Sequence, residues 1–199
     1  MKVNRREFLS RVGAGSIAVA SLPALMDMFK LPALAQAERG VVFLCVNAAG
    51  THRIGMGGAA RFDPSRGAGS PVTGGGSFFH WTAAPPPSPL VASGTWNARL
   101  LTSYKELATY AGVAAGVAEF VIDIQRLRPS PALIRGAVLT VYCNLGPAGV
   151  GEAQTGGAEG YTLSIPGTDF SAGGNPGIFR QQPGGVRGLT IFLLPESLT

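Results

Sequence analysis

Apolar and polar residues alternate through much of this chain with the two-residue period of half-buried β-strands. In residues 120–125 the even positions are Phe, Ile and Ile, while the polar Asp123 and Gln125 face the other way. Residues 137–143 alternate in the same manner. The other strand-length runs, rich in β-branched and aromatic residues, are 41–46, 77–82, 94–103, 161–165 and 189–194, and a ragged hairpin strand is expected over 53–62.

Residues 103–116 carry a mixed pattern. Ser103 and Glu106 have the spacing of a helix capping box, and the apolar residues that follow fit a helical period. Gly112 and Gly116 weaken such a helix by about 1 kcal/mol each relative to Ala. The pattern therefore predicts at most a short helix that leads into a strand.

These elements predict an all-β fold. Seven to eight strands joined by turns, with room for hardly any helix between them, favour an antiparallel β-sandwich or barrel with long Gly/Pro-rich loops. The run of prolines at 85–89 cannot pair in a sheet and is expected to be an extended connector. With 29 Gly and 15 Pro but 46% hydrophobic residues, the chain has many turn formers and ample apolar surface to bury.

The N-terminus resembles a twin-arginine signal peptide, which directs folded proteins out of a bacterial cytoplasm. Arg5 and Arg6 precede Glu7-Phe8-Leu9 and a weakly apolar run over 12–26, which is too short to span a membrane stably. Ala35 and Ala37 place small residues where signal peptidase requires them. The resemblance implies recognition by the export machinery, cleavage before Glu38 and a periplasmic, extracellular or cell-surface location. Residues 1–37 are then the signal and 38–199 a single β-rich domain.

Most of the net positive charge of the chain lies in residues 1–37. The whole sequence has 16 Lys and Arg against 11 Asp and Glu, but residues 38–199 keep only 11 positive and 9 negative residues, a net charge of +2. Their arginines are scattered singly, with no basic stripe and no cluster interleaved with aromatic residues. This pattern argues against nucleic acid as a partner.

Cys45 and Cys143 are the two cysteines, and each ends an apolar strand with its side chain on the apolar face. In an exported protein, two thiols in one core predict a disulfide, worth about 4–5 kcal/mol for a loop of this length in the chain-entropy model. Two separate buried thiols are the alternative.

Cys45, His52, Met56 and His80 supply the His₂Cys-plus-Met ligand types of a blue-copper site. Their order along the chain differs from that of the cupredoxins, in which a Cys, a His and a Met cluster near the C-terminus. Copper binding with an electron-transfer role is therefore the alternative to a protein without a cofactor.

No catalytic motif stands out in the sequence. No serine lies in a G-x-S-x-G elbow, and the acidic residues have no paired spacing. On a strand, Ser77 and His80 face opposite sides, which disfavours a dyad between them. We therefore expect a protein that is not an enzyme.

Phe78, Trp81 and Trp96 fall on neighbouring predicted strands and form a candidate ligand platform or barrel mouth. Buried core positions are the ordinary alternative for aromatic residues. The C-terminal run 189–194 is apolar on both faces, which fits a central strand or one paired with a second copy. The sequence thus predicts an exported, non-catalytic binding or assembly protein of unknown ligand, capable of self-association.

Overall fold

The computed structural model describes residues 38–49, 52–82, 90–110, 113–143, 160–166, 178–179 and 189–195. All of its strands lie in one compact unit that spans residues 33–199. The strands are β1 (Arg39–Ala49), β2 (His52–Phe62), β3 (Ser70–Pro71), β4 (Thr73–Thr82), β5 (Leu90–Tyr110), β6 (Val113–Arg128), β7 (Ala132–Cys143), β8 (Gly160–Ser164), β9 (Ile178–Phe179) and β10 (Leu189–Leu193). A 3₁₀ turn, η2 (Pro64–Arg66), follows β2.

The predicted all-β antiparallel fold is confirmed. Seven to eight strands were expected, and the described residues form ten, of which β3 and β9 are only two residues long. The sheet runs in the order β3-β5-β4-β2-β1-β10-β6-β7-β8-β9, and a further pairing joins β5 to β6. That pairing closes a ring of six strands, β1, β2, β4, β5, β6 and β10, from which β7, β8 and β9 continue.

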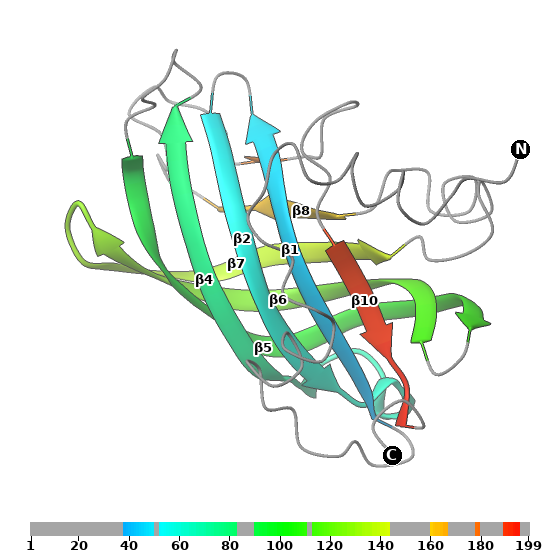
Figure 1. Cartoon of the computed structure of the whole chain (residues 1–199). Helices are drawn as coiled ribbons and strands as arrows, with labels where there is room; N and C mark the ends of the chain where they lie inside the picture. The colour runs from blue at the N-terminus through cyan, green and yellow to red at the C-terminus, as the bar shows by residue number, and fades with distance from the viewer. Residues whose placement is uncertain are drawn as a thin grey trace, which may run out of the picture. The chain divides into compact units, whose positions relative to one another are not determined.

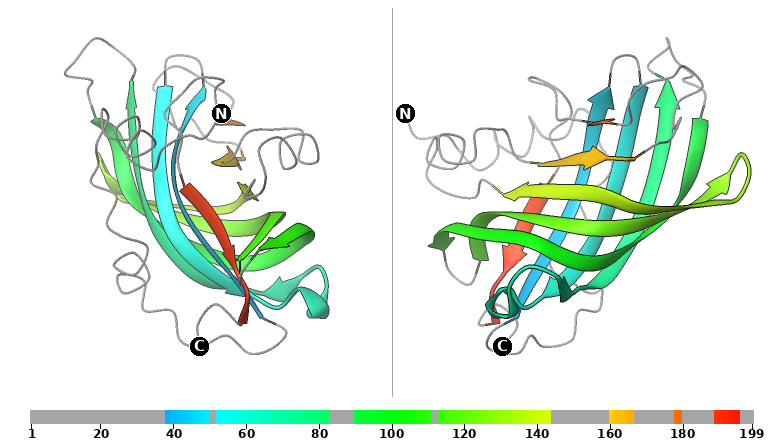
Figure 2. Two further views of the ribbon diagram at one scale, coloured as in Figure 1. Left: turned by 45° about the vertical axis from the view of Figure 1, so that its right-hand side comes forward. Right: turned by 180° about the vertical axis from the view of Figure 1, so that it is seen from behind.

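Two layers result from this topology. Strands β1, β2 and β4 run together in one layer, and β5, β6, β7 and β8 cross behind them at a steep angle (Figures 1 and 2). Strand β5 belongs to both layers, because its first half pairs with β4 while β6 follows it along most of its length. Four register shifts in the β5–β6 pairing bend the long strand from one layer to the other.

Trp96 on β5 marks the tight inside of this bend. Its inner-face neighbours in the register are Gly76 on β4 and Gly58 on β2. A Cβ atom at Gly58 would lie 2.6 Å from the Trp96 ring, so only glycine leaves room for the indole there. The ring Nε1–H donates to the Gly57 carbonyl oxygen at 3.2 Å, which satisfies the one polar atom of this buried side chain.

The core lies between the inner faces of the two layers. Each predicted strand contributes alternate residues to it, among them Phe43, Phe78 and Leu139. At one end four rings pack together, with Phe62 within 5.3 Å of both Tyr104 and Phe120 and within 6.4 Å of Phe192, centroid to centroid. These contacts join β2, β5, β6 and β10, and so stabilise the closed ring.

The pattern allowed at most a short helix within residues 103–116, and the described residues of that segment, 103–110 and 113–116, are strand throughout. Strand β5 runs to Tyr110 and β6 begins at Val113. The two strands are paired from Ser103↔Glu119 to Tyr110↔Val113, with one register shift between Glu106 and Ala108. Glu106 does not cap a helix. Its carboxylate accepts from Tyr104 Oη at 3.1 Å and from Arg39 Nε at 3.3 Å. The extended backbone lets Tyr104 reach the ring cluster, and tertiary packing outweighs the local helical signal.

Candidate functional site

Two histidines meet inside the fold, at one end of β2 and β4. His80 lies on the inner face of β4 opposite Ile54 and is fully buried. His52 begins β2, and its Nδ1 atom lies 3.0 Å from His80 Nε2. Burial, and secondarily the neighbouring His52, lowers the pKa of His80 to about 4. At neutral pH the His80 ring is therefore uncharged.

Asn47 and Tyr161 complete this buried polar region. Asn47 faces inward from β1, and its side-chain Nδ2 donates to the Tyr161 carbonyl oxygen of β8. The Tyr161 hydroxyl donates to the Ile54 carbonyl oxygen at 2.8 Å, and burial raises the pKa of that phenol. These bonds tie β8 to β1 and β2 across the core. The sequence pattern did not single out either residue, because each lies beside apolar strand residues and carries no motif.

The four predicted copper ligands do not come together. Cys45 on β1 is the cross-strand partner of Met56 on β2, and His52 contacts His80. Met56 and His52 are four residues apart on one strand, which is about 13 Å at the usual rise per residue. One ion cannot bind both pairs at that separation. The described residues contain no group of three or more His, Cys, Asp and Glu arranged to hold a metal.

The two cysteines are both buried thiols, and the predicted disulfide is not formed in the structure. Both contact Thr190 of β10. Cys45 Sγ lies 3.6 Å from the Thr190 hydroxyl oxygen, and the Cys143 thiol donates to the Thr190 carbonyl oxygen at 3.1 Å. The thiols thus hydrogen-bond to the strand between them, which corresponds to the alternative of separately packed thiols.

The predicted aromatic platform divides between two faces of the sheet. Phe78 and Trp96 are each only 1% exposed and belong to the core. Trp81 lies on the outer face of β4, opposite in direction to Phe78 and His80. Its aromatic neighbour there is Phe79, which is 53% exposed. Strict alternation along β4 predicts that Phe79 and Trp81 share one face and that Phe78 and His80 share the other, so it would have placed Phe79 beside Trp81.

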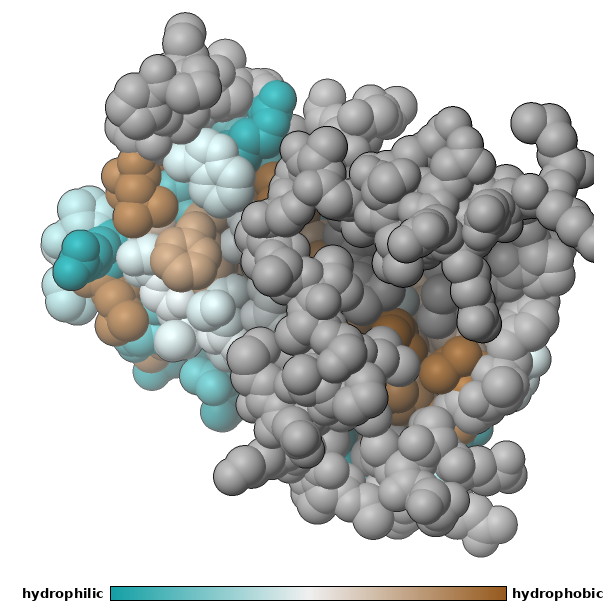
Figure 3. Space-filling view, in the orientation of Figure 1, coloured by the Kyte–Doolittle hydropathy of each residue, from teal (hydrophilic) through white to brown (hydrophobic). Residues whose placement is uncertain are grey.

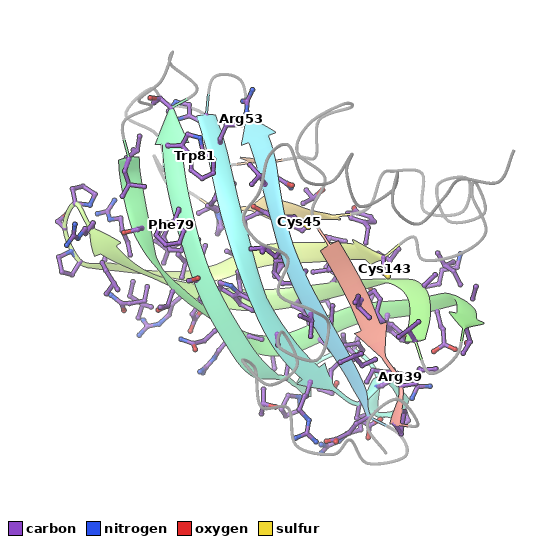
Figure 4. The ribbon with its side chains drawn as sticks, viewed as in Figure 1. Arg39, Cys45, Arg53, Phe79, Trp81 and Cys143 are labelled. Atoms are coloured by element: carbon purple, nitrogen blue, oxygen red, sulfur yellow. The ribbon has the colours of Figure 1, made fainter. Side chains whose placement is uncertain are left out.

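The outer face of β1, β2 and β4 is therefore the candidate functional site. We call it the aromatic face and define it by Leu44, Gly55, Gly57, Ser77, Phe79 and Trp81. In the register Leu44 lies beside Gly57 and then Ser77, while Gly55 lies beside Phe79. Figure 4 shows Phe79 and Trp81 along β4, with Arg53 at the end of β2.

The glycines of β2 shape this face. Trp81 is directly opposite Arg53, yet its ring reaches over Gly55, where a Cβ would lie 3.2 Å from two ring carbons. Leu44 similarly covers Gly57, since its Cδ1 would lie 2.8 Å from a Cβ there. On the β4 side of this face the space-filling view shows apolar side chains separated by pale, weakly polar ones (Figure 3). The face thus presents apolar side chains that lie over the glycines of β2 and are separated from one another.

The carboxylates of the second layer are engaged in the sheet. Glu119 accepts from Thr102 at 2.8 Å and from Thr140 at 3.3 Å, and Asp123 lies 3.6 Å from the Arg99 guanidinium. These pairs join neighbouring strands on the outer surface and have the ordinary role of cross-strand pairs. Ser77 is exposed and His80 is buried on the opposite side of β4, as the alternation predicted.

Arg5, Arg6, Ala35 and Ala37 of the predicted signal lie outside the described residues. The described part of the chain has no helix long and apolar enough to cross a membrane. No protein-family model, no curated protein and no solved structure matches this chain.

Proposed function

We propose that this is an exported, non-catalytic binding protein that uses the aromatic face to hold a ligand or partner. The observation that carries the proposal is the exposure of Phe79. Its side chain is 53% exposed, whereas the preceding residue, Phe78, faces the core and is 1% exposed. Leu44, on the same face, is 45% exposed. Large apolar side chains exposed together on a sheet are typical of interaction sites.

Export is part of the same proposal. Arg5 and Arg6 resemble the twin-arginine signal, and Ala35 and Ala37 form the cleavage site, so the domain would leave the cytoplasm already folded. Its partners are then the export machinery, signal peptidase and a component met outside the cytoplasm. A binding role needs no cofactor, and the arrangement of the aromatic face supplies none of the acid–base pairs that catalysis uses.

The test uses the processed protein and a cell-envelope preparation from the cells that produce it. Protein that sediments with the envelope is compared for the natural sequence, for Phe79→Ser and for Trp81→Ala. Leu133→Ser is the matched control, because Leu133 is 48% exposed but lies on β7. Both face variants should lose sedimentation and the control should keep it.

Sedimentation velocity on the same variants measures self-association. If the natural protein is a dimer and the Phe79→Ser variant is a monomer, the aromatic face binds a second copy of the chain. The proposal is wrong if neither face variant changes envelope binding or oligomeric state.

A further inference from the structure

Resting on the proposed binding role of the aromatic face, we infer that its ligand is a neutral polysaccharide, whose sugar rings stack on Trp81 and Phe79. Three features of the face carry this inference: the placement of its two rings, its lack of carboxylates and the hydroxyl groups beside it.

The two rings project from the same side of β4. Phe79 and Trp81 are two residues apart on one strand, so their Cα atoms are about 7 Å apart along it. The Trp81 ring extends sideways over Gly55 toward β1. Aromatic rings carry negative charge on their faces, which attracts the weakly positive C–H groups of a sugar ring. Successive rings of one chain could therefore contact both side chains.

The described strands that form the face contribute no acidic residue to it. Strands β1, β2 and β4, and β5 as far as Asn97, contain no Asp or Glu. Their three arginines lie toward the strand ends. Arg53, at the start of β2 and directly opposite Trp81, donates to the His52 carbonyl oxygen at 3.0 Å. Arg39 pairs with Glu106 and Arg61 pairs with Glu38, both within 3.3 Å. Without a carboxylate the face has no partner for an ion pair with a basic peptide, and its one bordering cation, Arg53, lies at the strand end beside Trp81, away from the Phe79 and Ser77 rows. Its chemistry therefore matches an uncharged ligand.

Hydroxyl and amide groups border the rings on the β5 side. Ser77 lies beside Thr95 in the register, and Phe79 lies beside Ser93. Asn97 follows one row further along, next to Gly75. These side chains both donate and accept hydrogen bonds, as the hydroxyl groups of a sugar do. Ring contacts flanked by such groups would bind a polysaccharide with little dependence on salt, because no ion pairs are formed.

The experiment measures depletion of the processed protein from solution by insoluble cellulose and by chitin, and its retardation by soluble dextran and glucomannan. The natural protein should bind at least one of these polymers with the same affinity at low and high salt. Phe79→Ser and Trp81→Ala should each weaken that binding about ten-fold or more, the effect typical of central aromatic contacts. Leu133→Ser should bind as the natural protein does.

The outcomes separate this inference from the proposed function. Failure to bind any of the four polymers, or binding that both face variants retain, would overturn the polysaccharide ligand. If Phe79→Ser still abolishes envelope binding, the proposed function stands and only the ligand class is wrong. A dimer that Phe79→Ser dissociates would identify a second copy of the chain as the occupant. Circular dichroism of each variant confirms that the fold is kept.

Discussion

His52 Nδ1 and His80 Nε2 lie 3.0 Å apart, on neighbouring strands and with His80 fully buried. At this distance one ring donates an N–H to the other ring's lone pair, which requires that the two rings are not both charged. The groups that face His80 from the adjacent strands, Ile54 and Ala92, are apolar and cannot compensate a positive charge. Burial among these apolar groups therefore favours the neutral form of the His80 ring.

This arrangement predicts that the protein loses stability in mild acid. The pKa of His80 is about 4 in the folded protein, against about 6.5 for an unperturbed histidine. As pH falls from about 6.5 to 4, the unfolded chain takes up a proton that the folded protein does not. The free energy of unfolding should then fall by up to about 3 kcal/mol over that window. Urea unfolding at about pH 7.5 and pH 4.5 measures the difference.

The control for this prediction is His80→Gln, which keeps a hydrogen-bonding side chain but does not titrate. The variant should be less stable at neutral pH and should lose much less stability on acidification than the natural protein. An equal loss in both proteins would show that His80 is not the group responsible.

The contacts of Thr190 predict the behaviour of the thiols. Cys45 and Cys143 are both buried against β10, so a thiol reagent should react slowly with the folded protein. In denaturant it should titrate two thiols per chain, and one in Cys143→Ala. An intact mass lower by two hydrogens, with no thiol detected in denaturant, would contradict the reduced state seen in the structure.

The buried phenols predict a second loss of stability, in alkali. Burial, assisted by the Glu106 carboxylate, raises the pKa of Tyr104 well above its usual range, and burial does the same for Tyr161. The unfolded chain loses these protons above about pH 10, whereas the folded protein keeps them, so the free energy of unfolding falls as pH rises further. In an ultraviolet titration both phenols should ionise only as the protein unfolds. A phenolate absorbance that decreases in Tyr104→Phe while the fold persists would contradict this, because Tyr104 would then be ionising in the folded protein.

The strands could be predicted because their patterns are local. The alternation around Ile122 and Leu139 shows which residues face the core, and both are fully buried. The same rule separates Phe78 from Phe79, so the exposed ring could have been located from the sequence. The sequence does not show whether the Phe79 ring or the Trp81 ring lies over a glycine of β2, because that depends on the pairing of β4 with β2.

The remaining features depend on contacts between distant segments. Glu106 fits a helix cap by spacing, but its partner Arg39 lies 67 residues away. The two cysteines both face the core, yet Thr190 of β10 lies between them, and the position of β10 in the sheet has no local signal. The contact of His52 with His80 likewise depends on the register of two strands.

The predicted leader gives a test of export. Replacing Arg5 and Arg6 together by Lys keeps the charge but removes the bidentate guanidinium groups of the twin-arginine signal. The protein should then accumulate in the cytoplasm with residues 1–37 attached, whereas the natural sequence should be recovered outside with Glu38 at its N-terminus. Mass spectrometry of the cell fractions distinguishes the two forms. Unchanged export of the double variant would show that the arginine pair is not the signal.

Glycines of the first layer should differ sharply in their tolerance of a methyl group. A Cβ at Gly76 would lie 2.0 Å from the Gly57 carbonyl oxygen and 2.7 Å from Gly58 Cα, so β2 and β4 would have to separate. We expect Gly76→Ala to lower the free energy of unfolding by about 3 kcal/mol or more. At Gly55 the nearest atoms belong to the Trp81 ring, which can tilt away, so Gly55→Ala should cost about 1 kcal/mol or less while changing the Trp81 fluorescence. Urea unfolding of the two variants measures both losses in the free energy of unfolding. Equal losses would mean that β2 and β4 are less closely packed at Gly76 than the structure shows.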